Sequence, residues 1–221
     1  MTTVDVLHAG RQLLEHDEAR RQVALADRVL LTKADLAGTD VAARAEQEVR
    51  LLNPGAMIEA VRHGRADPAL VFDAAGVTPE QKLAEIARWE RMLANDHNAH
   101  DHDGADHHHH RHDHGVRSLA LTAEEPLDWL AVQDWLAALR HSRGRDLLRV
   151  KGILDLAGES QPVAVHGVHH VFHEPVRLSH WPERPARSRI VLIFSSDLDP
   201  QPLIADFTQL AGPLAQAPLL R

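Results

Sequence analysis

The residues with the clearest capacity for chemistry are nine histidines in the run NDHNAHDHDGADHHHHRHDHG, from Asn95 to Gly115. Neutral imidazole binds zinc and other borderline metals well, and the five aspartates of the run offer carboxylate oxygens beside it. A flexible chain offers several equivalent ligand sets, which favours moderate, fast-exchanging binding. We predict metal binding by His97, His100, His102, His107, His108, His109, His110, His112 and His114. Zinc is expected first, with cobalt or nickel as alternatives, because ligand softness and spacing do not separate these metals.

The same run has two other interpretations. Its only apolar residue is alanine, so it cannot bury enough surface to order itself and is predicted to be a linker. The histidines of a solvated linker need have no role in the cell. An expression tag is disfavoured because the run is internal and interleaved with aspartate.

A second histidine group lies in the motif HGVHHVFH, which we expect to be part of one strand. On a continuous strand His169 and His173 share one face, and His166 and His170 share the other. These four residues are secondary metal candidates. Histidines satisfied by backbone groups are commoner on strands, however, so a structural role is favoured.

The stretch LLTKADL, Leu30–Leu36, is an apolar strand that ends in Thr32, Lys33 and Asp35. A carboxylate at the end of a strand can accept hydrogen bonds from both N1–H and the 2-amino group of guanine, a donor pair that adenine lacks. Such a site rejects the wrong base by leaving its own polar group unpaired. The aliphatic part of the lysine can cover the base. We predict that these three residues read guanine; ordinary solvated loop residues are the alternative.

In its wider context, RRQVALADRVLLTKADL resembles the guanine-recognition region of the CobW-like P-loop GTPases, a family linked to metal insertion and zinc homeostasis. The segments DLLRVKGILDLAG, PVAVHGVHHVFHEPV and SRIVLIF resemble the C-terminal domain of that family, and a histidine-rich insert between the two domains is common in it. The family's phosphate-binding pattern Gly-x-x-x-x-Gly-Lys-Ser/Thr does not occur in these residues, and its Cys-x-Cys-Cys motif is impossible without cysteine. The resemblance therefore implies a member without its first half and with no catalytic residue.

The elements that must position these residues form two patterns. In the first, short strands (2–7, 28–32, 56–61) alternate with helices (9–26, 39–53, 78–93), which indicates a parallel α/β sheet. In the second, strands at 118–122, 146–158, 162–176 and 188–195 combine with helices at 126–140 and 202–210, which indicates an α+β domain with an antiparallel sheet. We expect Thr39 or Asp40 to cap the second helix. The predicted domains are 1–94, the C-terminal half of a CobW-like GTPase domain; 95–115, the linker; and 116–221, a CobW C-terminal-type domain. Residues from about 116 to 212 are expected to fold without the rest of the chain.

Composition excludes several classes of protein. The net charge of −8, without a Lys/Arg stripe, argues against nucleic-acid binding, and the absence of cysteine excludes disulfides and thiolate zinc sites. We see no signal peptide and no run of about 18 apolar residues, so a cytoplasmic protein with no membrane partner is expected.

Three functions remain open. The first is a zinc-binding and delivery protein that serves a metal-requiring client protein and binds GTP weakly or only with a partner. The second is a GTPase completed by a separately encoded chain that carries the P-loop. The third is a fragment without function.

Overall fold

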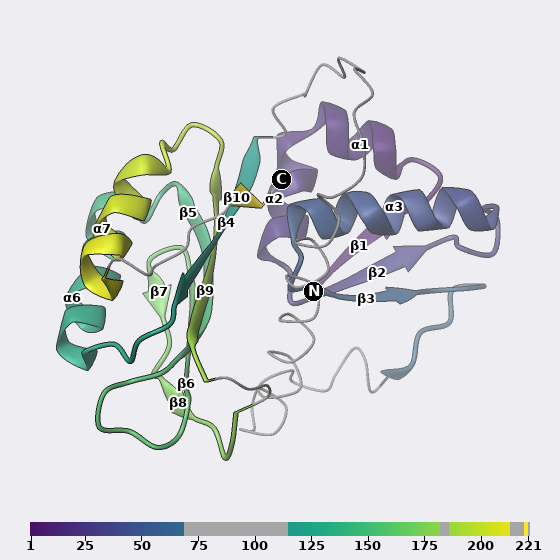
Figure 1. Cartoon of the computed structure of the whole chain (residues 1–221). Helices are drawn as coiled ribbons and strands as arrows, with labels where there is room; N and C mark the ends of the chain where they lie inside the picture. Colours follow the sequence, from purple (N-terminus) through teal and green to yellow (C-terminus); the bar gives the residue numbers. More distant parts are fainter. Residues whose placement is uncertain (69–114, 182–185, 213–218, 221) are drawn as a thin grey trace, which may run out of the picture.

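The computed structural model describes residues 1–68, 115–181, 186–212 and 219–220, which form two sheets with helices packed on them (Figure 1). The first 68 residues build a parallel sheet in the order β1-β2-β3. Its elements are β1 (Thr2–Asp5), α1 (Ala9–Glu15), α2 (Asp17–Leu25), β2 (Arg28–Thr32), α3 (Thr39–Leu52) and β3 (Met57–Ala60). These elements confirm the expected strand–helix alternation as far as β3; the helix expected over 78–93 lies outside the described residues.

The part of the chain after Gly115 forms an antiparallel sheet in the order β10-β4-β9-β5-β6-β7, with β8 also paired to β6. Its elements are β4 (Val116–Ala123), α6 (Trp129–Arg143), β5 (Leu147–Leu154), β6 (Val163–Val168), β7 (Val171–Phe172), β8 (Val176–Arg177), β9 (Ser188–Ser195), α7 (Gln201–Ala211) and β10 (Leu219–Leu220). The predicted combination of a parallel α/β sheet with an antiparallel α+β sheet is therefore confirmed. In the described ranges no helix has both the length and the apolar character needed to cross a membrane.

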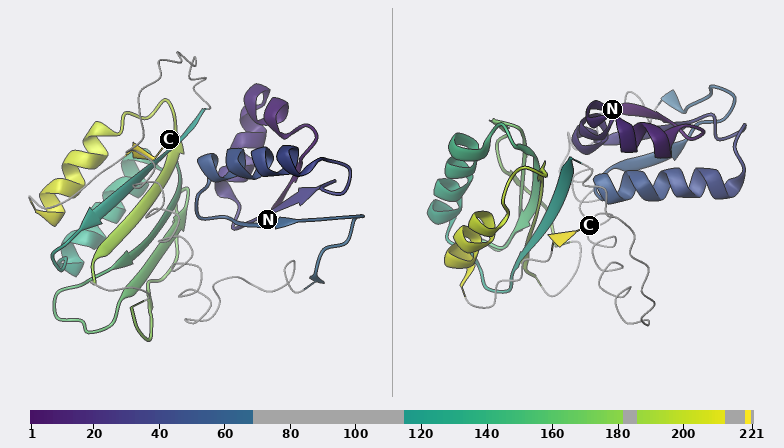
Figure 2. Two further views of the ribbon diagram at one scale, coloured as in Figure 1. Left: turned by 45° about the vertical axis from the view of Figure 1, so that its right-hand side comes forward. Right: turned by 90° about the horizontal axis from the view of Figure 1, so that it is seen from above.

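The antiparallel sheet is covered on both faces. Helices α6 and α7 pack on one face, around Val132, Trp135 and Phe207. On the opposite face, strand residues such as Ile153 and Val191 join one continuous apolar core with residues of the N-terminal part. Figure 2 shows this order from two further sides, with the antiparallel sheet between its own helices and the N-terminal elements. The two parts are thus joined by a shared core.

A charged cluster strengthens this junction. The guanidinium of Arg149, in β5, is almost fully buried and donates to the carbonyl of Leu25 at 2.5 Å and to the carboxylate of Asp27. The Lys151 ammonium lies 3.1 Å from the same carboxylate. Burial raises the pKa of Asp27, but the two cations outweigh that effect and lower it to about 2. The turn before β2 is therefore held directly on β5.

The helix expected over 9–26 is two helices, because the chain leaves the helical conformation at His16 (φ −122°, ψ 106°). The cause is Arg20, whose buried guanidinium donates to the carbonyls of Leu13 at 2.6 Å and Leu14 at 2.7 Å. It thereby satisfies carbonyls that a continuing helix would have used. Periodicity alone could not show this, since apolar spacing continues through the break.

Two further expectations about helices need correction. Helix α3 begins after Gly38, which acts as N-cap without any side-chain hydrogen bond, so neither Thr39 nor Asp40 caps it. In α6 the sequence pattern predicts that Trp129, Val132 and Leu136 face inward; the structure buries Val132, Trp135 and Leu139, and Trp129 and Leu136 are only partly buried.

The strand expected over 162–176 is also wrong as a single element. Strand β6 ends at Val168, the chain turns through His169 (φ 51°), and β7 returns against β6. Strand β8 then pairs with the beginning of β6. A hairpin therefore replaces the straight strand, and the assignment of histidines to faces changes with it.

Candidate functional site

The guanine-reading residues lie where the strands of the parallel sheet end. Thr32 is the last residue of β2, and its hydroxyl donates to the carbonyl of Val4 in the neighbouring strand at 3.3 Å. Lys33 and Asp35 follow directly in the turn. Because β1, β2 and β3 are parallel, their carboxyl ends bring Asp5 and His63 to the same edge. This is the edge at which open α/β sheets bind ligands.

Lys33 is held by a carboxylate of the neighbouring strand. Its ammonium lies 2.6 Å from Oδ2 of Asp5, and Nδ1 of His8 lies 3.0 Å from the same oxygen. Burial raises the pKa of Asp5, but hydrogen bonds from Lys33 and His8 outweigh it, so the pKa is lowered. The lysine therefore has a defined position at the edge of the sheet.

Asp35 faces the turn after β3. Its Oδ1 accepts the backbone N–H of His63 at 3.1 Å, and its Oδ2 lies 3.0 Å from Nδ1 of the same residue. The backbone hydrogen bond from His63 is the main reason that the pKa of Asp35 is lowered. The carboxylate is thus ionised at neutral pH and already engages two partners of the kind that guanine would offer.

The backbone at this edge is held in an uncommon conformation. Lys33 (φ 62°) and His63 (φ 51°) both occupy the left-handed region, which costs free energy for residues other than glycine. Such conformations concentrate at binding sites. Together with the charged pairs, they make this edge the best-defined polar site in the described N-terminal part.

Among the secondary metal candidates, the pair that meets differs from the pairs expected. His166 and His173 lie opposite each other across the β6–β7 hairpin, with their rings stacked at 4.1 Å between centroids and 16° between planes. The backbone N–H of His173 donates to the carbonyl of His166 at 3.1 Å. His169 and His170 occupy the turn. The expectation that His169 shares a strand face with His173 is therefore wrong, because the hairpin reverses the chain between them.

The histidine run cannot be placed in the same way. His97, His100, His102, His107, His108, His109, His110, His112 and His114 lie outside the described residues. Within the described ranges, no group of three or more His, Asp or Glu side chains is arranged to hold a metal ion. The stacked pair, with two imidazoles, does not supply a complete tetrahedral set by itself.

Sequence reasoning missed the partners of the predicted base-reading residues. Asp5, His8 and His63 are distant in sequence from Lys33 and Asp35, and no motif unites them. One signal was available: Asp5 ends one strand of the parallel sheet, His63 follows another, and the carboxyl ends of parallel strands share an edge.

The fold defines a class in which a parallel α/β unit packs on an antiparallel α+β domain. Residues 116–211 match the family model described as the cobalamin synthesis protein cobW C-terminal domain. Zinc chaperone YjiA of Escherichia coli strain K12 is 27% identical over 169 residues, which cover 76% of this chain and 48% of that protein. The chain therefore spans about half the length of this curated relative.

Solved structures agree with this relationship. The Zn(II)-bound YjiA GTPase of E. coli superposes with a TM-score of 0.69 at 25% identity, over 95% of this chain and 60% of that one. A Zn(II)-bound triple mutant of YjiA also has a TM-score of 0.69 at 25% identity, over 95% of this chain and 59% of the other. Residues 116–211 thus match the CobW C-terminal domain, and the chain as a whole is homologous to YjiA. The resemblance seen in the sequence is confirmed.

Proposed function

We propose that the chain binds zinc through its histidine run and delivers it to a client protein that requires the metal. The observation that carries the proposal is the nine histidines of residues 95–115 in a homologue of a zinc chaperone. The lack of cysteine does not oppose it, because histidine and carboxylate ligands suffice for zinc. Cobalt and nickel are the alternative metals, since the same ligands suit them.

The composition of the histidine run favours a zinc buffer with exchanging ligands over a single closed zinc site. Its nine imidazoles exceed the four positions of a tetrahedral zinc ion, so many ligand sets of similar energy compete. Exchange between sets keeps dissociation fast, as delivery to another protein requires. Each ligand must be deprotonated, so the affinity should fall as the pH drops through about 6.5.

For the nucleotide, we propose that Thr32, Lys33 and Asp35 address the guanine base and that this chain alone binds GTP weakly. Phosphate contacts to a glycine-rich loop supply much of a nucleotide's affinity, and these 221 residues contain no such pattern. A second chain that supplies a P-loop would complete a GTPase. A neighbouring reading frame that encodes a P-loop and a Cys-x-Cys-Cys motif would favour this alternative.

Zinc titration by calorimetry tests the main proposal. The intact chain should take up zinc, and a variant lacking residues 97–114 should lose most of that uptake. The double variant His166→Ala, His173→Ala is the matched comparison and should bind as the intact chain does. If deletion leaves the uptake unchanged while the double variant loses it, the site lies at the β6–β7 hairpin and the linker proposal is overturned.

A further inference from the structure

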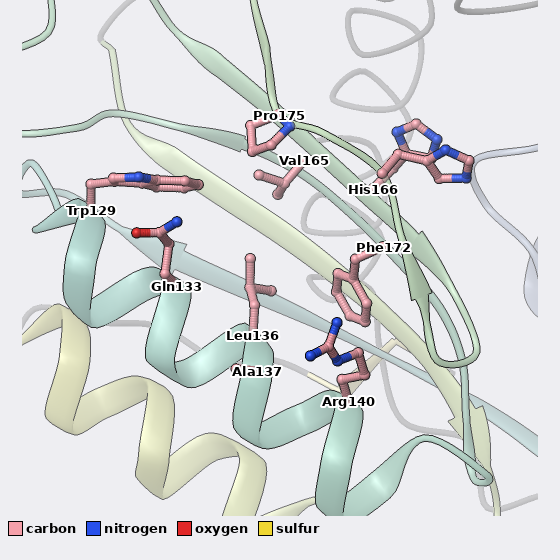
Figure 3. A pocket seen from close by; sticks show the side chains of 10 residues that line it. Trp129, Gln133, Leu136, Ala137, Arg140, Val165, His166, Phe172 and Pro175 are labelled. Carbon is pink, nitrogen blue, oxygen red and sulfur yellow. The ribbon is translucent and has the colours of Figure 1, made fainter.

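A small cavity opens between helix α6 and the edge strands β6 and β7 of the antiparallel sheet, and the stacked pair His166 and His173 contributes to its lining. Trp129, Leu136, Val165, Phe172 and Pro175 provide most of its apolar wall. Figure 3 shows the Leu136 and Arg140 side chains rising from α6 towards the strands, where Val165 and Phe172 face them. Trp129, Leu136 and Phe172 are only partly buried, so some apolar surface stays open to solvent here.

The volume of the cavity limits its occupant. At about 190 Å³ it is smaller than the pockets of roughly 300–1,000 Å³ that hold drug-sized ligands and nucleotides. It has about the volume of one large apolar side chain. An aromatic or aliphatic anchor of a partner protein therefore fits better than a free cofactor, because a single buried anchor in a pocket is how protein interfaces concentrate their binding energy.

The rim adds a positive charge that has no partner in the described part of the chain. Arg140 lines the cavity, and Arg143 and Arg145 follow where α6 ends; none of the three makes an ion pair with a described residue. The α6 end also lies against the β6–β7 turn, because an added Cβ at Gly144 would be 3.6 Å from Cβ of His170. The chain as a whole carries a net charge of −8, so the positive charge at the C-terminal end of α6 has the opposite sign to the net charge.

An exposed apolar residue adjoins the cavity on α6. Leu130, beside Trp129 at the start of α6, is 69% exposed. Exposed apolar surface around a pocket is typical of a protein interface. The apolar wall and Arg140, which has no ion-pair partner among the described residues, thus meet at the same opening.

We propose that this cavity, lined by Trp129, Leu136, Arg140 and Phe172, docks a segment of a partner protein that presents one large apolar side chain beside a carboxylate. The apolar side chain enters the cavity, and the carboxylate pairs with Arg140 at the rim. A guanidinium binds a carboxylate through two parallel hydrogen bonds, which fixes the orientation of the segment. His166 and His173, the secondary metal candidates, also line the cavity, but the docking of the segment requires neither zinc nor guanine nucleotide, so the proposal extends beyond the function proposed above.

The test uses the full chain and a fluorescein-labelled eight-residue peptide with one phenylalanine between two glutamates. Fluorescence anisotropy should show saturable binding that weakens as salt is raised, because the rim contribution is electrostatic. Replacing the phenylalanine by alanine, or both glutamates by glutamine, should each weaken binding at least tenfold. An absence of saturable binding up to millimolar peptide would overturn the proposal.

Two pairs of variants locate the binding. Ala137→Glu places a long acidic side chain at the cavity wall, and it should abolish binding without disturbing the helix, since glutamate is a good helix former. Ala138→Glu, on the same helix but outside the lining, is its control and should bind the peptide as well as the unmodified chain. Arg140→Gln should weaken binding tenfold or more, whereas Arg143→Gln should have a much smaller effect. Equal binding by Ala137→Glu and Ala138→Glu would place the peptide elsewhere and refute the docking site.

Discussion

Replacement of Asp27 by asparagine tests whether the charged cluster holds the two parts of the chain together. The carboxylate neutralises Arg149, whose side chain is 4% exposed, and Lys151, whose side chain is 14% exposed. Asparagine has nearly the same shape but no charge, so Arg149 and Lys151 lose the negative charge that Asp27 supplies. A buried charge that loses its partner raises the free energy of the folded state, so we expect the substitution to lower the stability of the chain.

The size of the effect follows from the pKa of Asp27. A fall from 3.8 to about 2 corresponds to at most about 2.4 kcal/mol of stabilisation at neutral pH. The side chain is 52% exposed, so solvent screening reduces this contribution, and we expect Asp27→Asn to cost about 1 kcal/mol of unfolding free energy. The value is measurable because a domain of this kind has only about 5–15 kcal/mol in total.

The pH dependence has a definite sign. A carboxylate with a lowered pKa stabilises the folded state above its unfolded pKa, and that contribution disappears as the pH falls through the folded value. The unmodified chain should therefore lose this stabilisation between about pH 4 and pH 2. Asp27→Asn should lack that part of the acid dependence, because it has no proton to take up at this position.

The assay is urea denaturation at pH 7, followed by tryptophan fluorescence and circular dichroism, and repeated at lower pH. Asp134→Asn, an exposed change on α6, is the control and should leave the midpoint unchanged. Arg149→Met should cost less than Asp27→Asn if it repacks, because it removes the buried charge while Asp27 remains half in solvent. Equal stability and equal acid dependence in Asp27→Asn and the unmodified chain would refute the cluster as a junction between the two parts.

Three further outcomes are expected. Asn53→Ala should lower the free energy of unfolding by about 1–3 kcal/mol, measured in a thermal or urea melt. The reason is that the buried amide nitrogen of Asn53 donates to three carbonyls at the end of α2 or just after it, at 2.8–3.1 Å. Asn53→Asp keeps the shape but loses the donors, so it should destabilise the chain at least as much. Gly152→Ala should lower the free energy of unfolding by about 1–3 kcal/mol, since its new Cβ would lie 2.9 Å from Cγ1 of Ile190. Gly38→Ala is the control: a Cβ there meets nothing within 4 Å, so the loss should be about a few tenths of a kcal/mol. The purified chain with magnesium should release no phosphate from GTP above background and bind guanine nucleotides no better than roughly millimolar, about −4 kcal/mol; sustained turnover that is lost in Asp35→Ala would contradict this.

The shared core bears on whether the C-terminal domain is stable without the N-terminal part. The sequence suggested that residues 116–212 could fold alone, since they contain complete strands and helices. In the structure, Ile153, Val191 and Ile193 on one face of the antiparallel sheet are covered by the N-terminal part. An isolated C-terminal domain would expose these side chains, so we expect its stability to fall and its tendency to associate to rise.

Local sequence patterns predicted the type of most described long elements and the pairing of a parallel with an antiparallel sheet; the helix over 9–26 and the strand over 162–176 are the exceptions. Val29, Leu30 and Leu31 form an uninterrupted apolar run, and a run of that length bounded by polar residues specifies a buried parallel strand. The segment SRIVLIFS became β9 over the expected residues, Ser188–Ser195. Local patterning suffices in these cases because burial on both faces of a strand leaves few other ways to hide so many apolar side chains.

The tertiary structure alone decided which distant residues meet. Arg20 ends α1, Arg149 reaches Asp27 across 122 positions, and His63 engages Asp35 from another strand end. None of these contacts is encoded in a local pattern, since each depends on where the packing of the sheets and helices places a long side chain. The β6–β7 hairpin stacks His166 on His173 for the same reason. The reversal of the chain at His169 determines which imidazoles are neighbours, and the spacing of histidines in the motif does not.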